Sequence, residues 1–599
     1  MPRPGATRAA FLAGAAAAFV AAVDLARWVR PGVLLDPDPA WSAPRLFLTL
    51  FVIAGAAGAG VLLAAAVLLA VRRLPAALSA APVPLPRAAL AGVASGAILL
   101  GTVARFASLA NLPPSLWIDD VSLIAPALAL SGAPRDFSDS VRPAPYGVPK
   151  TYGSVGVLYL EVYRAVLLFF GTTVFSVRFL SAAAGAVSLV TSLALARTLL
   201  PRGGGALAAL ILAGLRWHLI LSRWGWNAVV VAPVVDLAAL LLLTARRRAS
   251  LPLALTAGAV AGLAAHVYLA AWIAAAALLL LAAWPSLGPR PAGRRGSLAL
   301  LFAVGFACAA APIFLWREGR VAPYFARASD HSLAAEIRYS RSAMPAFAAA
   351  ADSLAAPWFV ADPVARNDLP GRMRLGWILG VAVAVALARS LLKTREEISA
   401  YLLSHAGAAL AGSVAGGQAG VPNGYRFGYL CDTAAVAAAA GFLCLLALFP
   451  RSRRRAAAVA VLGLVAVSGV LGARDALGVW PQRRESFDGF HGQDTMLARA
   501  ALRWEPYGSV TVSRGLAHSA ITIEGIRRYR LEPRPPSSSP AGPPARSFRI
   551  VPPDTPATSS ERAVERLRDA WGRDWGVVLG RKVGGTSRSG ILPASGLSR

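Results

Sequence analysis

The sequence predicts an all-α polytopic membrane protein that ends in a small extracytoplasmic α+β appendage. Hydrophobic residues make up 56% of the 599 residues, and charged residues only 15%. The apolar residues gather in runs that are long enough to cross a bilayer. After residue 472 the composition becomes polar and richer in proline and serine. The first two observations exclude a soluble globular protein.

About thirteen transmembrane helices are expected from the apolar runs. They cover residues 9–26, 45–71, 88–109, 175–199, 203–221, 227–245, 251–267, 269–284, 298–316, 374–392, 398–415, 428–449 and 456–472. The stretch 251–284 is interpreted as two helices rather than one long helix. A division at His266–Leu269 keeps the charges of the connectors in regular alternation.

The transmembrane core is expected to begin after a proline-rich break. Pro82, Pro84 and Pro86 interrupt the apolar pattern, which is typical of a linker. Residues 1–85 would therefore contribute two extra N-terminal transmembrane helices. Residues 86–472 would form the core that carries the active site.

Basic clusters between the apolar runs predict the topology. They are Arg72 and Arg73, Arg197 with Arg202, Arg246 to Arg248, Arg290 to Arg295, Lys393 with Arg395, and Arg451 to Arg455. An excess of arginine and lysine marks cytoplasmic connectors, so the N-terminus is expected in the cytoplasm and the C-terminus outside it. The net charge of +30 thus reports topology in a cell membrane. No nucleic-acid partner is expected, because the basic residues are not gathered on one polar domain.

With this topology, two long loops and the tail share the extracytoplasmic side. The loops are residues 110–174 and 317–373, and the tail is residues 473–599, which we expect to be partly flexible. Within the tail, alternating apolar residues predict strands at 508–515 and 521–531. A helix is predicted at 560–571.

An adjacent pair of acids, Asp119 and Asp120, is the main candidate for chemistry. The pair follows Trp117 at the start of an apolar helical run at the membrane surface. Acids at a helix N-terminus can serve only its structure, with Asp119 as the cap and Asp120 as a solvated neighbour. The alternative is a catalytic role, and the choice depends on which residues share this face of the membrane.

Several cations are expected on the same face as the acid pair. Lys150 and Tyr152 lie at the end of the same loop, and Arg223 and Arg426 lie in short outward connectors. Snorkelling at the membrane interface would explain the two arginines without any function. A functional interpretation is that the cations surround a phosphate, because the planar guanidinium donates several hydrogen bonds and stays charged.

The order of these features resembles the GT-C class of membrane glycosyltransferases. The resemblance is to the protein O-mannosyltransferase and lipid A aminoarabinose transferase group, which is glycosyltransferase family 39-like. It covers roughly residues 88–450. It is carried by Trp117, Asp119, Asp120, Tyr159, Tyr163, Gly171, Phe175, Ser176, Arg178 and Ser181, and by the stretches SRWGWN at 222–227, WFVADPVARNDLPG at 358–371 and PNGYRFGYLCDTAAVAAAAG at 422–441.

This resemblance implies a GT-C-like fold and a reaction. A sugar on a polyprenyl phosphate would be transferred, with inversion, to a lipid, glycan or protein acceptor on the extracytoplasmic face. Asp119 would be the catalytic base, and Asp120 would orient the acceptor or share its proton. Donor phosphate binding would fall to Lys150, Tyr152, Arg223 and Arg426. No cofactor is implied with certainty, although Asp119 and Asp120 have the oxygen ligands that a divalent cation, Mg or Mn, would need.

The alternative is a lipid-linked oligosaccharide flippase or another transporter, or a glycan polymerase or ligase. Transporters carry ionisable residues within their spans, often at broken helices. Asp24 and Asp236 are the main acids inside or beside apolar runs, with Asp432 near an outer end. Most other charge lies in loops, which favours chemistry at the membrane surface. A non-catalytic protein that only shares the fold is a third hypothesis.

Overall fold

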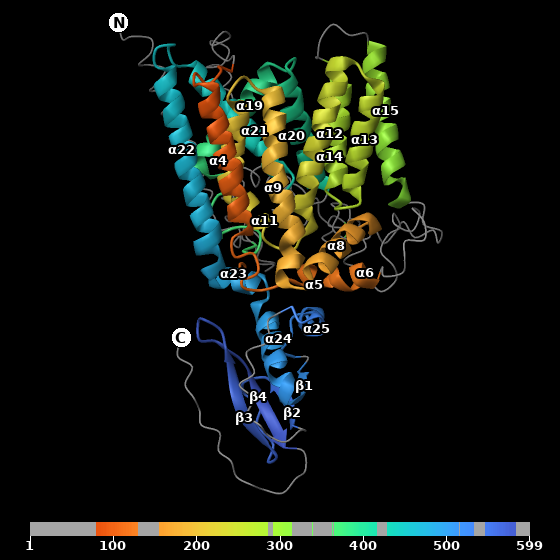
Figure 1. Ribbon diagram of the computed structural model, residues 1–599, viewed down its shortest axis with the longest axis vertical. Helices are drawn as coiled ribbons and strands as arrows, with labels where there is room; N and C mark the ends of the chain where they lie inside the picture. Colours follow the sequence, from red (N-terminus) through yellow and green to blue (C-terminus); the bar gives the residue numbers. More distant parts are fainter. Residues whose placement is uncertain are drawn as a thin grey trace, which may run out of the picture.

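The computed structural model describes residues 80–129, 155–285, 292–313, 338, 362, 364–415, 428–513, 515–531 and 546–582. These residues form a bundle of long helices with a smaller domain of helices and strands at one end (Figure 1). The two helices expected in residues 1–85 lie outside the described residues except for 80–85. Lys150, Tyr152 and Arg426 also lie outside them.

The bundle contains helices of two lengths. The longer ones are α4 (Arg87–Phe106), α9 (Val174–Leu199), α12 (Val231–Arg248), α15 (Ala292–Ala310), α19 (Gly376–Leu392), α20 (Glu397–Ala415), α21 (Leu430–Ala447) and α22 (Arg454–Arg474). The shorter ones are α10 (Gly204–Gly214), α11 (Arg216–Leu221), α13 (Leu251–Ala265) and α14 (Ala271–Ala283), with 3-10 turns at Asn227–Val230 and Ala311–Ile313. Each run expected to span the membrane between 88 and 472 thus contains helix.

Six helical segments in the described part are long and apolar enough to cross a membrane alone. Helices α19 and α20 pass that test only together, and they meet at an angle of 109°. Helices α10, α13 and α14 have 10 to 17 residues. At a rise of about 1.5 Å per residue, such helices are shorter than a hydrocarbon core of about 30 Å. The chain is a membrane protein, and the count of about thirteen crossings stays a prediction.

The expected division of residues 251–284 is confirmed. Helix α13 ends at Ala265 and α14 begins at Ala271. The break is held by bonds to His266: its carbonyl accepts from Gly156 N at 2.7 Å, and its Nε2 donates to the Ala309 carbonyl at 2.9 Å. Both partners belong to other parts of the chain, so tertiary contacts fix the position of the break.

Small residues allow α13 and α15 to pack backbone against backbone. A Cβ added to Gly258 would lie 1.9 Å from the Phe302 carbonyl oxygen, and one added to Gly305 would lie 2.0 Å from the Leu255 carbonyl oxygen. Only glycine, which has no Cβ, fits at these two positions. The abundance of alanine and glycine in the spans therefore serves close helix packing here, as is common inside membranes.

The arginine-rich connectors that the structure describes meet at one end of the bundle (Figure 1). Arg247, at the end of α12, donates to the Thr198 carbonyl at 2.7 Å and pairs with Glu397 at the start of α20. Arg246 donates to the Trp284 carbonyl at 3.0 Å. The C-terminal domain lies at the opposite end (Figure 1). This separation agrees with the expected topology, and the cellular side of each end stays a prediction.

Three short helices lie across the other end of the bundle. They are α5 (Ile118–Ser122), α6 (Ile124–Ala129) and α8 (Val157–Phe170) (Figure 1). Helix α8 is apolar on more than one side: Leu160 and Tyr163 are buried, whereas Leu168 and Phe169 are exposed. An apolar helix of this length, lying across the ends of the spans, fits the membrane interface.

The tail forms the expected α+β domain. A π-helical turn (Asp475–Val479) and a 3-10 turn (Trp480–Gln482) extend α22 toward it. Its elements are α23 (Arg484–Gly489), α24 (Gly492–Trp504), a 3-10 turn (Glu505–Tyr507), β1 (Gly508–Val512), α25 (Ala520–Tyr529), β2 (Arg546–Val551), β3 (Glu561–Arg568) and β4 (Asp574–Lys582). The sheet order is β1-β2-β4-β3, with β1 and β2 parallel and the other pairs antiparallel (Figure 1).

Two of the three secondary-structure predictions in the tail are wrong. The strand predicted at 508–515 is confirmed over Gly508–Val512. The strand predicted at 521–531 is helix α25, whose first turn is capped by the Ser519 hydroxyl and whose buried residues Ile523 and Ile526 have helical spacing. The helix predicted at 560–571 is largely strand β3, because pairing with β4 outweighs the local helical preference.

The C-terminal domain shares a hydrophobic core with the short outer helices. Val121 and Ile124 belong to the same buried cluster as Leu497 and Ile526. The amide of Leu116 donates to the Thr495 hydroxyl at 3.1 Å. The tail is therefore packed directly on the segment that carries Asp119 and Asp120.

Candidate active site

Asp120, rather than Asp119, caps the helix that the acid pair begins. Trp117 is the N-cap of α5, and its backbone amide donates to Asp120 Oδ2 at 2.9 Å. Asp120 is 0% exposed. The structural interpretation of the pair, with Asp119 as cap and Asp120 solvated, is thus wrong in both assignments.

Asp120 lies in a dry site at the end of the bundle. Its Oδ1 faces the backbone of Gly225. Burial raises the pKa of Asp120 to about 6, against the opposing effect of the Arg178 charge and the Trp117 amide. Arg178 itself donates to the carbonyls of Leu109 (3.0 Å) and Ser115 (2.8 Å). Asp120 and Arg178 therefore stabilise the loop from which Asp119 projects.

Asp119 has a different environment from its neighbour. It is 9% exposed, and its Oδ2 accepts from Trp117 Nε1 at 2.9 Å. The indole of Trp117 is covered by Arg366, whose guanidinium carbon lies 3.9 Å from the ring centroid. The ring of His491 lies 4.3 Å from the same indole, measured between ring centroids. Asp119 is therefore oriented by a tryptophan that a cation and an imidazole also contact.

Five side chains define what we call the Trp117 cluster: Trp117, Asp119, Arg366, His491 and His518. The rings of His491 and His518 lie 3.4 Å apart, measured between centroids. His491 adopts a positive φ of 48°, which is uncommon outside glycine and is often found at functional sites. Burial, His518 and Arg366 lower the pKa of His491 to about 4. His491 is therefore a neutral hydrogen-bonding group at pH 7.

Contacts from both the bundle and the tail hold Arg366 in place. Its Nη1 donates to the Gly489 carbonyl at 3.3 Å, and the neighbouring Ala365 carbonyl accepts from Trp480 Nε1 at 2.7 Å. The segment is anchored further by Arg216, whose Nε donates to Asp368 Oδ1 at 2.7 Å. Two domains thus position the cation of the cluster.

Sequence reasoning missed three members of this cluster. Arg366 lies in the stretch 358–371, which carries part of the family resemblance but gave no individual role. His491 and His518 lie in the tail, which we expected to be a separate appendage. The available signal was rarity: the chain has only six histidines, and two of them meet here.

The structure gives Arg223 a role that differs from the expected one. Its Nη1 donates to the carbonyls of Ala104 (2.7 Å) and Arg105 (3.1 Å), and its Nη2 donates to those of Ala107 and Leu112. Arg223 is fully buried. It satisfies carbonyls at the C-terminal end of α4, which would otherwise lack partners. These contacts do not support donor phosphate binding by Arg223.

The described residues offer little to a divalent cation. Among them, no group of three or more histidine, cysteine, aspartate or glutamate side chains could hold a metal ion. The Oδ2 atoms of Asp119 and Asp120 are both occupied by Trp117, one by the indole and one by the amide. The pair is therefore organised around a tryptophan. The expected contributions of Lys150, Tyr152 and Arg426 lie outside the described residues and stay predictions.

Comparison with known proteins finds similarity in solved structures alone. No protein-family model and no curated protein matches the chain. One similar structure is the archaeal oligosaccharyltransferase AglB from Archaeoglobus fulgidus in complex with an inhibitory peptide and a dolichol-phosphate. It has 16% identity and a TM-score of 0.43, over 76% of this chain and 61% of that one. This chain thus spans less than two thirds of the oligosaccharyltransferase.

Two structures of ArnT from Cupriavidus metallidurans are also similar. The apo form has 15% identity and a TM-score of 0.46, and the form bound to undecaprenyl phosphate has 14% identity and a TM-score of 0.43. Both alignments cover 82% of this chain and 98% of ArnT. Function has to be judged from the side chains of the site.

Proposed function

We propose that this protein is a membrane glycosyltransferase that moves a sugar from a polyprenyl-phosphate donor to an acceptor hydroxyl. The observation that carries the proposal is the position of Asp119 in the Trp117 cluster. The Asp119 carboxylate is nearly buried and is oriented by the Trp117 indole N–H. A guanidinium and two imidazoles lie in the same cluster, at the end of the bundle that faces the C-terminal domain. The motifs that resemble the GT-C class support the same reaction.

Asp119 acts as the general base. It accepts the proton of the acceptor hydroxyl while the acceptor oxygen attacks the anomeric carbon. The bond between that carbon and the phosphate oxygen breaks, and the lipid phosphate leaves with the electron pair. Displacement in one step inverts the anomeric centre. The Trp117 indole fixes the orientation of the carboxylate, so that its second oxygen receives the proton.

Arg366 stabilises the leaving group. Negative charge grows on the lipid phosphate as the bond breaks, and a positioned guanidinium lowers the energy of that state. In this proposal Arg366 takes the part that the sequence assigned to Arg223. Lys150, Tyr152 and Arg426 remain proposed donor-binding residues. Asp120 has a structural role, because its carboxylate caps α5.

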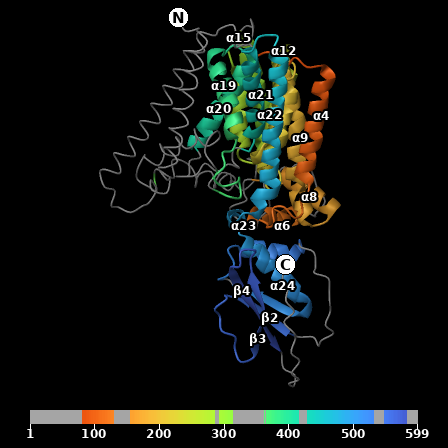
Figure 2. The ribbon, with the colours of Figure 1, turned by 90° about the vertical axis from the view of Figure 1, so that its left-hand side faces the viewer.

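The location of the cluster favours transfer at the membrane surface. The helices α6 and α8 lie at the end of the bundle that faces the C-terminal domain (Figure 2), and α25 of that domain packs against α5. A lipid phosphate reaches this level from the bilayer, whereas the acceptor arrives from the aqueous side. We propose that this side is extracytoplasmic, because the arginine-rich connectors lie at the opposite end.

The experiment that tests this function follows the lipid product, which is independent of the acceptor. The full-length protein is placed in liposomes with polyprenyl-phosphate sugars and cell-envelope extract as the acceptor source. We expect stoichiometric release of polyprenyl phosphate and transfer of the sugar with inverted configuration. If the sugar crosses the bilayer with its lipid bond intact, the protein is a flippase. If neither process occurs with any sugar, the proposal is contradicted.

A further inference from the structure

A second polar cluster lies inside the helix bundle. It consists of Arg105 at the end of α4, His218 in α11, Asp236 in α12 and Asp432 in α21. Their exposed fractions are 0%, 0%, 2% and 0%. Ionisable side chains inside a membrane are expensive, and they usually mark a functional site. Neither the proposed transfer reaction nor the Trp117 cluster uses these residues.

Arg105 fixes the protonation of the histidine ring. Its Nη1 donates to the Gly101 carbonyl at 2.7 Å, and its Nη2 lies 3.1 Å from the Leu212 carbonyl and 2.5 Å from His218 Nδ1. A guanidinium can only donate, so His218 Nδ1 is the acceptor and the ring proton lies on Nε2. His218 Nε2 points toward Asp432, 3.7 Å from its Oδ1. Among the described residues, this nitrogen has no hydrogen-bond partner at ordinary distance.

The two acids adjoin each other. The side chains of Asp236 and Asp432 interact directly, and Asp236 Oδ2 accepts from the Thr191 hydroxyl at 3.1 Å. An ionised carboxylate has only acceptors, and two ionised carboxylates side by side repel each other strongly in a medium of low dielectric constant. Such a pair is stable when it shares one proton.

The sum of the charges in the cluster also indicates that the two acids share one proton. Arg105 carries one positive charge, and two ionised carboxylates would carry two negative ones, so an excess negative charge would lie in the membrane interior. One proton makes the cluster neutral. Nearby ions are already paired: Arg374 Nη2 lies 2.8 Å from Asp362 Oδ2, and Arg216 bonds Asp368.

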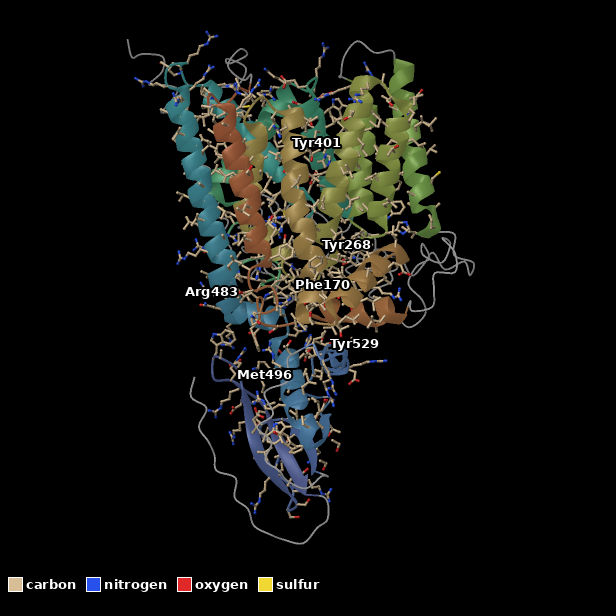
Figure 3. The ribbon with its side chains drawn as sticks, in the orientation of Figure 1. Phe170, Tyr268, Tyr401, Arg483, Met496 and Tyr529 are labelled. Carbon is tan, nitrogen blue, oxygen red and sulfur yellow. The ribbon has the colours of Figure 1, made fainter. Side chains whose placement is uncertain are left out.

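In the described part of the chain, the phenols and the thiol that adjoin the acids are neutral at pH 7. Tyr401, labelled in Figure 3, lies among the long helices, and its hydroxyl is 3.0 Å from the Thr433 hydroxyl. Tyr429 and Cys431 adjoin Asp432 along α21 and are buried. Phenols and thiols ordinarily ionise above pH 8. His218 Nδ1 accepts from Arg105 and cannot take up a proton, so the compensating proton has to lie on the two acids.

We propose that Asp236, Asp432 and His218 form a site that binds one exchangeable proton in the membrane interior. The ligand is a proton. When it is bound, the site is neutral and contains the Arg105 cation, one carboxylate and one carboxylic acid. The site gives the bundle a means to take up or release a proton between α11, α12 and α21. This inference does not depend on glycosyl transfer.

Infrared spectroscopy of the full-length protein in liposomes at pH 8 tests the site. A protonated carboxyl has a carbonyl stretch that shifts in heavy water when its proton exchanges. We expect this band in the wild-type protein and its loss in Asp236→Asn or Asp432→Asn, because the remaining carboxylate alone balances Arg105. Asp554→Asn, at an exposed position, is the matched control and should retain the band. If neither variant loses a carboxylic acid band, the proposal is wrong.

If both variants fail to fold, a measurement on the wild-type protein shows whether one aspartate holds a proton. Aspartate carboxyl carbons are isotopically labelled, and the protonated fraction is counted at pH 8. Asp120, whose pKa is raised to about 6, is ionised at that pH. We expect one aspartate to remain protonated and its proton to exchange. If all labelled aspartates are ionised at pH 8, the proposed site does not exist.

Discussion

Two neighbouring carboxylates have different environments in this protein, and the difference supports the roles that we propose for them. Asp120 is enclosed by the α5 cap and by Gly225, whereas Asp119 projects into the Trp117 cluster. The sequence could place the pair at a helix start on the membrane surface. The family resemblance favoured Asp119 as the base. The sequence could not show that the two acids differ in environment, because Asp120 is enclosed by Gly225, which is distant along the chain.

The raised pKa of Asp120 predicts a dependence of stability on pH. Its pKa rises from 3.8 to about 6 on folding, so the folded state prefers the protonated form. Stability from this group is fully present below pH 3.8 and is lost as the pH rises to about 6. At about 1.4 kcal/mol for each pKa unit, the loss is at most roughly 3 kcal/mol.

Asp120→Asn replaces the protonated acid by an uncharged group of the same shape. We expect the melting temperature of the wild type to fall between pH 4 and pH 6.5 relative to this variant, with Asp554→Asn as the control that follows the wild type. Parallel curves for Asp120→Asn and the wild type would show that the carboxyl is not buried as described.

Arg366 gives a second prediction at the residue scale. Removal of a positioned charge from a leaving group typically slows the reaction about 100-fold or more. We expect Arg366→Ala to lower kcat for polyprenyl phosphate release by this order. Arg366→Lys keeps the charge and should recover part of the rate. A purely structural part for Arg366 predicts instead that the two variants lose activity and thermal stability together.

At the scale of elements, tertiary contacts decide several features that local patterns left open. Helix α25 was predicted as a strand, because Ile521 and Ile523 alternate with polar residues. Its docking on Val121 buries Ile523 and Ile526 with helical spacing instead. Strand β3 carries charged residues at many positions, and its pairing with β4 overrides its helical preference. The partner of α25 comes from another part of the chain, whereas the partner of β3 is the next strand along the chain.

A substitution of Arg223 tests whether it stabilises the end of α4 or binds the donor phosphate. Arg223→Lys retains the charge but loses at least part of the hydrogen bonds to the helix carbonyls. Carbonyls left without partners in a buried site cost about 1–3 kcal/mol each. We therefore expect a clear fall in melting temperature, with donor affinity unchanged in the folded fraction. Normal stability with weaker donor binding would restore the phosphate-binding role.

The contact between α13 and α15 gives a prediction for packing. Gly258→Ala places a methyl group 1.9 Å from a backbone oxygen of the neighbouring helix, so we expect the helices to separate and the melting temperature to fall. Gly407→Ala in α20 is the matched control, because no described residue lies within 4 Å of its added Cβ. The control should be neutral or stabilise by up to about 1 kcal/mol. Equal effects of the two substitutions would contradict the described packing.

At the scale of the whole molecule, the sequence predicted the layout better than the sites. Hydrophobic runs and arginine clusters located helices between residues 88 and 472 and the end at which their basic connectors meet. Both polar clusters require residues that only folding brings together: Arg366 with His491 and His518, and His218 with Asp236 and Asp432. Side chains this far apart in the sequence carry no common pattern that a single chain reveals.

Topology can be tested with a reporter joined after Lys582, at the end of β4. The account places the C-terminal domain outside the cytoplasm, because the arginine-rich connectors lie at the far end of the bundle. An enzyme that is active only outside the cytoplasm should therefore be active at this position, and a reporter joined after Arg248 should be inactive. A cytoplasmic signal from the first fusion would contradict the shared compartment of the loop, the tail and the Trp117 cluster.

The role of Asp119 as the base is tested by single-turnover measurement of sugar transfer by the wild type and by Asp119→Asn. Donor binding is measured separately in the same liposomes. We expect Asp119→Asn to bind the polyprenyl-phosphate sugar normally but to transfer it about 100-fold to 10,000-fold more slowly, because no base then accepts the acceptor proton. Transfer by Asp119→Asn at the wild-type rate would show that Asp119 is not the base.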